Sequence, residues 1–490
     1  MSIEAVVGVD IGTTETKALV VGTDGRQLGF ARGKTTWDGA ETTADALFAD
    51  AVAAVGAALA DAESVAGQRV RVLGLGLAGF AESGVVLDGD GRVVTPVIAW
   101  YDQRGAAELA GLDPTFRSVF ARRTGLPLGP QWTIGKLLWL QETRGDLPPG
   151  ACWLNIPEYI AHRLGAARIT EPSLASRTGL LDQATGREWP AALALLGVDR
   201  LLPDSLNAGH AAGTVAPGIL DGLTGAVITV VGHDHPVAAT GVGATGENEL
   251  FNSCGTADVI LRTVPRPLTD DERERLVHRG IDAGTHVLSG QSVLIGGVRA
   301  GLVMRRVLAM LGADGPAGRA GLDKPATEDQ SITEDQPVTE DRPVAKDQPV
   351  ADPCRTAVSV TGARSTDEDV TVTVTDGASP HAVWAAALDH ISEVTENLLH
   401  GMNEVVGTHR AAVAAGGWTR MATVRDAKRR ILPGLRFSAM AQPGAFGAAL
   451  FAAWAAAGNP GDFQTFAGPL RRTALESPTT TPVVASKEHT

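Results

Sequence analysis

The same pattern occurs twice in this chain, once near the N-terminus and again near its middle. GVDIGTTETKALVV (8–21) and LFNSCGTADVILRT (250–263) each contain an apolar strand, a Gly-Thr turn and a second strand. Between them, strands and helices alternate to about residue 243, as in an α/β domain. Because 490 residues are too many for one compact core, the pattern predicts two α/β halves with a cleft between them.

Small side chains must supply much of the packing in these halves. Only 4% of the residues are aromatic, while 44% are hydrophobic and 58 are glycines. A helix is expected over about 43–63, where apolar residues recur at helical spacing. GAFGAALFAAWAAAG (444–458) is too short and too rich in glycine and alanine to cross a bilayer, so it predicts a buried helix.

The net charge and the cysteine content indicate which partners and which cellular compartment to expect. The net charge is −14 and no long block of Lys and Arg occurs, which argues against a nucleic-acid partner. Cys152, Cys254 and Cys354 lie far apart without zinc spacing, as expected in a reducing cytoplasm. The segment MSIEAVVGVD does not have the pattern of a signal peptide, so we expect a cytoplasmic protein with no membrane partner.

One segment fits neither half. TEDQSI-TEDQPV-TEDRPV-AKDQPV (327–350) is an acidic six-residue repeat with prolines and no aromatic side chains, a composition typical of disorder. A disordered surface insert and a partner-docking segment are both compatible with it. We therefore expect an N-terminal domain over 1–245, a C-terminal domain over 246–470 with an insert at about 323–353, and a loose tail over 471–490.

RVLGLGLAGF (71–80) contains the pattern GxGxxG after a predicted strand. A dinucleotide site needs a helix that begins at this turn, so that its N-terminus faces the pyrophosphate. The next residues, FAESGVVLDGDG, predict a short turn and a hairpin instead. We interpret the glycines as positions of close packing along a central strand. The chain also lacks the GxxxxGK[ST] pattern of a P-loop.

Polar residues at the first strand end are candidates for phosphate binding. Asp10 ends an apolar strand, Gly12, Thr13 and Thr14 form a turn, and Lys17 follows. Exposed N–H groups in such a turn can hold phosphate oxygens. Asp10 can hold Mg²⁺, through water. On the pattern alone, an ordinary hairpin with a polar turn explains these residues equally well.

Two segments of the second half could complete a nucleotide site. In NSCGTAD (252–258), Gly255 and Thr256 could form a matching phosphate turn. AVAAGGWTRM (412–421) is an apolar strand that ends at Gly416 and Gly417, where an adenine ring could lie against the backbone.

VVGHDHPVAATGVGA (230–244) places Asp234 between His233 and His235, at the end of a predicted buried strand. A catalytic base, a metal ligand and a polar group that caps a turn are all compatible with this triplet. Two imidazoles at i and i+2 can point to the same side of a strand. A zinc site would then need one or two further ligands.

The order of these motifs resembles that of the FGGY family of carbohydrate kinases, in the actin/hexokinase/Hsp70-like superfamily. The resemblance covers about residues 5–310 and 380–458. The matching segments are DIGTT-x-x-K for the first phosphate loop, IAWYDQR (98–104) beside the sugar pocket, GHDH for the catalytic aspartate, SCGT for the second phosphate loop, and GGW with QPGAFGAALFAAW (442–454) for the adenosine site.

The resemblance implies an α/β fold of two ribonuclease H-like (actin-like ATPase) domains with an interdomain cleft. It also implies ATP-dependent phosphorylation of a hydroxyl of a small sugar, ketose, polyol or sugar acid, with ATP and Mg²⁺ between the domains. Asp234 would be the general base, and Asp10 and Asp234 would be near the Mg²⁺ of the nucleotide. Cofactor contacts are implied for Asp10, Gly12, Thr13, Thr14, Lys17, Gly255, Thr256, Gly416 and Gly417, and substrate contacts for Glu82, Trp100, Asp102, Arg104 and His235.

The chain departs from the family pattern at several positions. Two glycines stand where three are usual in the adenosine loop, Gln442 replaces an acidic residue, and TGARST (361–366) is only a distant match to a GxRxP stretch. These departures leave nucleotide preference and interdomain details open. GFAESG (79–84) matches neither a glycerol kinase nor a typical xylulokinase, so the substrate is also open. A homodimer is the default expectation.

Two other functions are compatible with such a fold. One is a catalytically degenerate kinase fold that serves as a sugar sensor or scaffold. Sugar-sensing repressors usually carry a helix-turn-helix before the DxGxT strand, whereas here that strand lies within the first residues. The other is a nucleotide hydrolase. Sugar-dependent release of ADP would distinguish a carbohydrate kinase from both.

Overall fold

The computed structural model describes residues 2–220, 222–255, 257–323, 358–365, 367, 369–375 and 377–476. Thr256, Cys354, the acidic repeat and the end of the predicted tail lie outside the described residues. Within them, Cys152 and Cys254 are free thiols. No helix in this part of the chain is long and apolar enough to cross a membrane.

The first sheet has six strands in the described part of the chain. Their spatial order is β11 (Gly213–Thr214), β12 (Val227–His233), β5 (Val70–Gly79), β1 (Ile3–Ile11), β2 (Glu15–Gly22) and β3 (Gln27–Lys34). Strands β12, β5 and β1 are parallel, while β1, β2 and β3 form an antiparallel meander. The predicted strand–turn–strand at the N-terminus is thereby confirmed.

The second sheet repeats this arrangement. Its order is β15 (Asp282–Thr285), β16 (Ser292–Val298), β14 (Asp258–Val264), β13 (Glu249–Cys254), β19 (Ala411–Ala415) and β20 (Leu435–Phe437). Strands β13, β14 and β16 form the antiparallel meander, and β19 and β20 continue parallel to β13. The strand pairs β1–β2 and β13–β14 therefore occupy equivalent places in two similar sheets, which confirms the predicted duplication.

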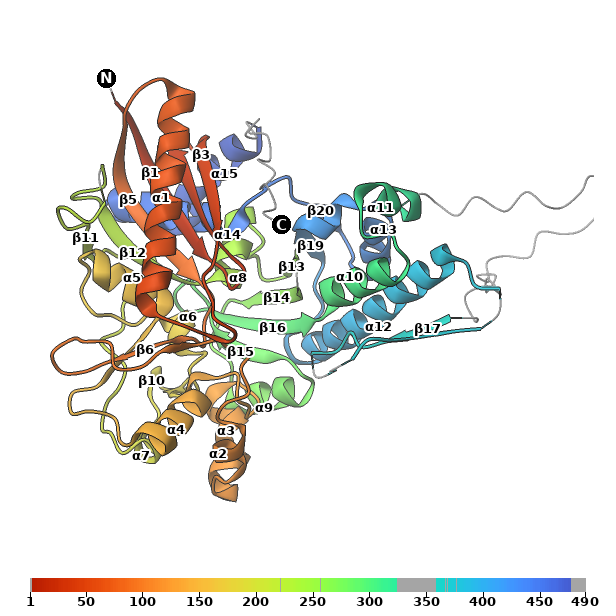
Figure 1. The fold of residues 1–490 in the computed structure, drawn as a ribbon, viewed down its shortest axis with the longest axis horizontal. Coiled ribbons are helices and arrows are strands. Elements are labelled where there is room, and N and C mark those ends of the chain that lie inside the picture. The colour runs from red at the N-terminus through yellow and green to blue at the C-terminus, as the bar shows by residue number, and fades with distance from the viewer. Residues whose placement is uncertain are drawn as a thin grey trace, which may run out of the picture.

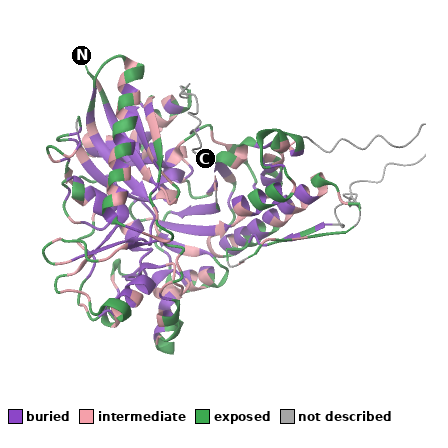
Figure 2. Ribbon diagram, in the orientation of Figure 1, coloured by how far each residue is buried: buried purple, intermediate pink, exposed green. Residues whose placement is uncertain are grey.

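Helices cover the outer face of each sheet. Helix α1 (Ala44–Ala66) packs on β2 and β3, and α5 (Ile156–Leu164) packs on β5 and β12. Helices α10 (Ala300–Met310), α12 (Pro380–Val406) and α13 (Ala422–Ile431) share a core with the second sheet. In Figure 1, α1 lies across the first sheet on the left, and α10 and α12 lie beside the second on the right. Figure 2 shows the strands of both sheets as mostly buried.

Helix α1 confirms the helix expected over 43–63. The Thr43 hydroxyl accepts a hydrogen bond from the backbone N–H of Ala46 at 3.2 Å, which satisfies one free donor of the first turn. The helix ends at Gly67, whose φ of 65° is left-handed, as is common after a helix C-terminus.

Two helices lie between the sheets. Helix α14 (Pro443–Ala456) packs on β1, β5 and β12, and it also packs against α8 (Asp234–Val242). Helix α8 in turn shares a core with β13, β14, β16 and β19 of the second sheet. The segment 444–458 is therefore a buried helix, as predicted. It follows the second sheet in sequence but packs on the first, together with the C-terminal helix α15 (Phe463–Glu476).

Glycines allow α14 to approach the first sheet this closely. A Cβ atom on Gly8 would lie 2.0 Å from the carbonyl oxygen of Ala445, and one on Gly76 would lie 2.2 Å from that of Ala448. The GxGxxG pattern over 74–79 therefore marks close packing along β5, as interpreted from the sequence. No helix follows β5, because the chain continues into β6 (Gly84–Leu87).

The remaining elements surround these layers. Helices α2, α3, α4 and α7 belong to a separate core cluster below the first sheet. The other described elements are β4 (Glu41–Thr42), β7 (Val97–Ile98), α2 (Ala106–Ala110), α3 (Pro114–Thr124), α4 (Thr133–Arg144), β8 (Cys152–Asn155), α6 (Pro172–Ala175), β9 (Leu181–Asp182), β10 (Arg187–Glu188), α7 (Pro190–Leu195), α9 (Asp270–His278), α11 (Pro316–Leu322), β17 (Val358–Thr361), β18 (Thr371–Val374) and the 3₁₀ turn η2 (Gly417–Arg420).

The contact between α14 and β1 leads to a first prediction. Gly8→Ala should lower the free energy of unfolding by about 2–3 kcal/mol, because the new methyl group would overlap backbone atoms that cannot move independently. Urea unfolding followed by circular dichroism would measure the change. Gly56→Ala, in the middle of α1, is the matched control: its Cβ would meet no atom within 4 Å, and helix propensity favours alanine by about 1 kcal/mol. A Gly8→Ala variant as stable as the parent would contradict this account of the packing.

Candidate functional site

The carboxyl ends of three parallel strands bring the main candidates to one edge of the first sheet. Asp10 on β1 pairs with Ala78 on β5, which pairs with Gly232 on β12. Neighbouring strands are about 4.8 Å apart, so β1 and β12 are separated by about 10 Å. Asp234 begins α8 directly after β12. The two aspartates therefore face the same space between the sheets.

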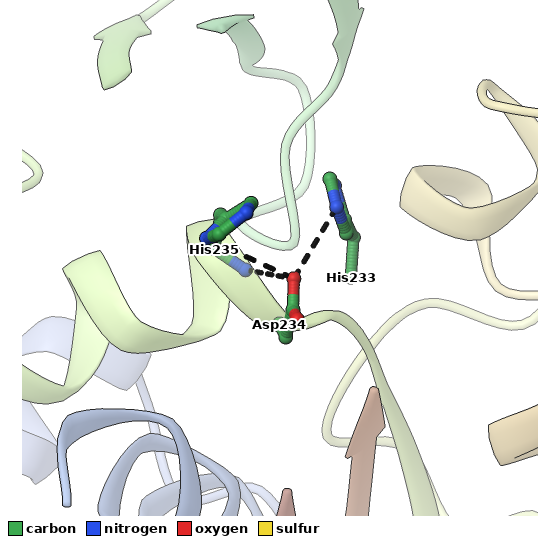
Figure 3. A group of neighbouring side chains, drawn as sticks. All are labelled: His233, Asp234 and His235. Carbon is green, nitrogen blue, oxygen red and sulfur yellow. Dashed lines mark hydrogen bonds and ion pairs between the residues drawn. The ribbon is translucent and has the colours of Figure 1, made fainter. Parts of the chain in front are cut away.

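Asp234 is held by its two neighbours, as Figure 3 shows. Its Oδ1 atom accepts the backbone N–H of His235 at 2.7 Å, and it lies 3.3 Å from Nε2 of His233 and 3.9 Å from Nδ1 of His235. The side chain of Asp234 remains 22% exposed, so another molecule can reach it. The triplet thus has a carboxylate that is both anchored and accessible.

Opposing effects set the protonation of this triplet. Burial tends to raise the pKa of Asp234, but His235, His233, the His235 N–H and Lys17 together hold that pKa below its usual value. Burial lowers the pKa of the His233 imidazole to about 3, so its ring is neutral near neutral pH. Asp234 is therefore ionised at neutral pH and able to accept a proton.

Asp10 lies in a different environment. Burial raises the pKa of its carboxyl group, the Lys17 ammonium opposes this, and the charge of Asp234 adds to it. A Cβ atom on Gly444 would lie 2.6 Å from Oδ2 of Asp10. The first turn of α14 thus touches this carboxylate, where the helix macrodipole favours negative charge.

The predicted first phosphate loop is tied to the neighbouring segments. The hydroxyl of Thr35 donates to the carbonyl of Gly12 at 2.7 Å, and the N–H of Thr35 donates to the carbonyl of Thr14 at 3.0 Å. The indole N–H of Trp100 donates to Oγ1 of Thr13 at 3.0 Å. The loop that carries Trp100 is therefore linked directly to the turn at 12–14.

In that loop, Trp100 and the Asp102–Arg104 pair have different surroundings. The Trp100 side chain is exposed, so a ring face is open to a ligand. Nε of Arg104 lies 2.8 Å from Oδ1 of Asp102, and Nη1 lies 2.6 Å from Oε2 of Glu41. Asp102 and Arg104 therefore form a structural ion pair, while the Trp100 side chain stays exposed beside the first turn.

Glu82 lies in a buried network of ion pairs. Its Oε1 accepts Nε of Arg177 at 2.6 Å, and Nη2 of Arg177 lies 3.1 Å from Oδ2 of Asp282 on β15. Burial raises the pKa of Glu82, while Arg177 opposes that rise. The φ of Glu82 is 68°, which is left-handed and uncommon for a residue other than glycine. A strained acidic residue beside the Asp234 edge is typical of a functional site.

The candidates of the second half form their own cluster. Strands β13 and β19 run side by side, so the turn after Cys254 lies beside the glycines after Ala415. Gly416 has a φ of 127°, and a Cβ atom there would lie 2.3 Å from the carbonyl oxygen of Cys254. Gly417 has open space where a side chain would stand. Gly255 and Gly416 are thereby brought together, as expected, whereas Thr256 lies outside the described residues.

Three buried cations near these clusters were not predicted from the sequence. Arg177 bridges Glu82 and Asp282, and Lys428 pairs with Asp258 just after the second turn. The Lys136 ammonium donates to the carbonyl groups of Pro130, Gln131 and Trp100 at 2.7, 3.1 and 3.3 Å. Burial lowers the pKa of Lys136 to about 8. Only Lys136 had a sequence signal, as a lone charge in the apolar run TIGKLLWL.

Comparison with known proteins places this arrangement in a family. The model of the FGGY family of carbohydrate kinases, N-terminal domain, matches residues 5–243. Over these residues the chain belongs to the FGGY family of carbohydrate kinases. L-fuculokinase of Escherichia coli (strain K12) is 27% identical over 282 residues, which make up 53% of this chain and 57% of that protein. Gluconokinase of Bacillus subtilis (strain 168) is 26% identical over 281 residues, 54% of this chain and 53% of that protein.

The similarity to solved structures covers both sheets of the chain. Ligand-bound xylulose kinase from Lactobacillus acidophilus matches with a TM-score of 0.78 at 18% identity, over 95% of this chain and 92% of that one. Plasmodium falciparum glycerol kinase with ADP matches with a TM-score of 0.76 at 15% identity, over 96% and 93%. At these identities the likeness shows the fold, which is α/β with two actin-like ATPase domains. In sequence, the chain spans about half the length of the curated relatives it matches.

The buried pair beside the second turn leads to a second prediction. Lys428→Met should lower the free energy of unfolding by about 3–5 kcal/mol, because it leaves the Asp258 carboxylate buried and unpaired. Thermal and urea unfolding would measure the loss. Replacing both partners with apolar residues, Lys428→Met with Asp258→Leu, should restore much of it.

The matched control is the next residue of the same helix. Arg429→Met removes a cation that is half exposed and pairs with exposed Asp426, so it should change the free energy of unfolding by less than about 1 kcal/mol. Equal effects of Lys428→Met and Arg429→Met would contradict the importance of the buried pair.

Proposed function

We propose that this chain is an ATP-dependent carbohydrate kinase that phosphorylates a hydroxyl of a small sugar, ketose, polyol or sugar acid. The match of residues 5–243 to the FGGY family model supports phosphoryl transfer to a carbohydrate. The geometry of the candidate site supports the role proposed for each residue. The observation that carries the proposal is the Asp234 carboxylate, which is ionised and accessible at the sheet edge that Asp10 also reaches.

Asp234 would act as the general base. As the substrate oxygen bonds to the γ-phosphorus and the bond to ADP breaks, the hydroxyl proton would pass to a carboxylate oxygen of Asp234. The His235 N–H fixes Oδ1, so the carboxylate is oriented before the substrate arrives. A depressed pKa suits a base that takes the proton late, after the oxygen has become acidic.

The nucleotide would lie between the two sheets. Asp10, with hard carboxylate oxygens, fits a Mg²⁺ ion, and Lys17 and the turn at 12–14 offer donors for phosphate oxygens. When bound, Mg²⁺ neutralises charge on the β- and γ-phosphate oxygens. Gly416 and Gly417 would border the adenosine, since Gly417 leaves open space beside the second turn. Gly255 and Thr256 would contact the phosphate from that side.

The sugar would lie next to Asp234, with Trp100 against one face. His235 is part exposed and adjacent to the base, so it could bond a substrate hydroxyl. Glu82 lies close enough to Asp234 for their charges to interact, although Arg177 already occupies one of its oxygens. Asp102 and Arg104 would act mainly by holding the Trp100 loop in place. Relatives named as fuculokinase, gluconokinase, glycerol kinase and xylulose kinase leave the substrate within this broad class.

The alternative is a kinase fold that binds sugar without transferring phosphate. It is supported by two departures from the family pattern: the adenosine loop has two glycines where three are usual, and Gln442 stands in place of an acidic residue. A panel of pentuloses, hexuloses, tetritols, glycerol and aldonates, assayed with Mg²⁺ and ATP for sugar-dependent ADP release, separates the two. Sugar binding to the chain without ADP release would favour the alternative.

A third prediction tests the base. Asp234→Asn should retain Mg²⁺-ADP binding but lower kcat by about 10²–10⁴-fold, because the amide cannot accept the hydroxyl proton. Steady-state kinetics on the best substrate of the panel and calorimetric titration with Mg²⁺-ADP would measure both. Asp204→Asn is the control, since that carboxylate is almost fully exposed and pairs only with Arg200 on the surface among its described ion pairs. Parent-like turnover in Asp234→Asn would show that Asp234 is not the base.

A further inference from the structure

We propose that His233, Asp234 and His235 form a binding site for a divalent transition-metal ion of the Zn²⁺ class, and that an ion bound there blocks phosphoryl transfer. The second part rests on the proposed function, since the same carboxylate would serve as base. The first part depends only on the three side chains. Mg²⁺ is not the ion meant here, because it prefers oxygen ligands alone.

The three side chains already approach the spacing of a metal site. One ligand atom from each residue lies within 4.8 Å of the other two. Two ligands on a tetrahedral zinc ion are separated by about 3.3 Å when their bonds are about 2.0–2.1 Å long. Nε2 of His233 lies 3.3 Å from Oδ1 of Asp234, and Nδ1 of His235 lies 3.9 Å from it. Small side-chain rotations would bring all three onto one ion.

The backbone that carries these ligands is fixed in place by a separate set of contacts. The N–H of His233 donates to Oγ of Ser173 at 2.9 Å, and Ser173 bonds to the buried carboxylate of Glu171. Gly232 has a φ of 112°, and a Cβ atom there would lie 2.4 Å from Oγ of Ser173. The chain is thus held rigidly just before the first ligand. A preorganised backbone lowers the cost of gathering the ligands around an ion.

The ligand set indicates which ions fit. Two imidazole nitrogens and one carboxylate oxygen are the donors of catalytic zinc sites, which keep a fourth position for water. Imidazole ligands suit Zn²⁺, Co²⁺, Ni²⁺ and Cu²⁺. The two imidazoles face each other at 5.4 Å between ring centroids, nearly edge to face, on either side of Asp234 (Figure 3). His235 and Asp234 are part exposed, so an ion can enter from the side that the sugar would use.

Occupation of the site has a direct consequence for the reaction. A bound divalent cation lowers the proton affinity of the whole Asp234 carboxylate, so this group becomes a much weaker base, and His235 could no longer turn toward the sugar. Metal and sugar should therefore exclude each other, whereas Mg²⁺-ATP on the Asp10 side should not displace the metal. The expected inhibition is competitive with the sugar.

The binding test uses the full chain without an affinity tag and without nucleotide, because ATP itself chelates Zn²⁺. Co²⁺ is the probe, since its visible absorption reports nitrogen and oxygen ligands, and Zn²⁺ should displace it. One ion per chain is expected. His233→Gln and His235→Gln should each weaken binding by at least about tenfold, since even the loss of an outer contact to a metal ligand costs that much. Circular dichroism of each variant checks that it is folded.

The matched control is His400→Gln. His400 is largely exposed on α12, where Nε2 lies 2.9 Å from Oε1 of Glu404, so it could bind metal only as an isolated surface pair. Binding should be unchanged in this variant. A Co²⁺ spectrum that is absent, or equally strong in folded His233→Gln and His235→Gln, overturns the site. Loss of binding in His400→Gln would overturn it too.

A second experiment tests whether the bound metal ion inhibits phosphoryl transfer. With free Zn²⁺ held by a metal buffer, the apparent inhibition constant should rise with sugar concentration and stay constant with Mg²⁺-ATP. Inhibition that more sugar does not relieve overturns this step. The two proposals fail separately: a chain that binds Co²⁺ through the triplet but phosphorylates no sugar retains the metal site and loses the kinase. If the chain phosphorylates sugar but does not bind Co²⁺, the proposed function stands and the metal site is wrong.

Discussion

The close contact of α14 with the first sheet is the constraint on which the site depends. Gly8 and Gly76 present bare backbone to the helix, so the helix axis lies nearer the strands than larger side chains would permit. As a result, Gly444 in the first turn of α14 touches the Asp10 carboxylate, and α8 is held between the helix and the second sheet. The same packing positions Asp234, which begins α8. A chain with few aromatic residues thus uses glycine to assemble a site from distant segments.

The two aspartates at that edge differ because their surroundings differ. Burial raises the pKa of Asp10, whereas His235 and its backbone N–H outweigh burial at Asp234 and lower its pKa. Neighbouring carboxyl groups whose environments push their pKa values apart can take different roles. Asp234, whose pKa is held low and whose side chain is part exposed, suits proton transfer. Asp10, which lies against the first turn of α14 and near Lys17, suits the phosphate and Mg²⁺ side.

The sequence predicted the parts that depend on local patterns. The strands, the helix expected over about 43–63, the buried α14 and the duplicated turns follow from periodicity and turn residues. The family resemblance implied that Asp10 and Asp234 lie near the same Mg²⁺, and the structure brings both to one edge of the first sheet. The Arg177–Asp282 and Lys428–Asp258 pairs did not follow, because their partners are 105 and 170 residues apart and no spacing rule connects them. For Asp102 and Arg104, the family resemblance implied sugar contacts, and only side-chain geometry shows that the two side chains pair with each other. Pairs between such distant residues form only once the chain has folded.

The same side chains at 233–235 keep the Asp234 carboxylate ionised and supply donor atoms for a metal ion. A base at this edge must stay ionised despite burial, and the flanking imidazole of His235 together with its N–H achieves this. Placing nitrogen donors within 4 Å of a carboxylate oxygen also creates the donor set that transition metals prefer. In the described part of the chain, no other imidazole combines a buried ring, an anchored carboxylate and a rigid preceding turn. The features that hold the base ready are therefore the same ones that would let a metal ion occupy it.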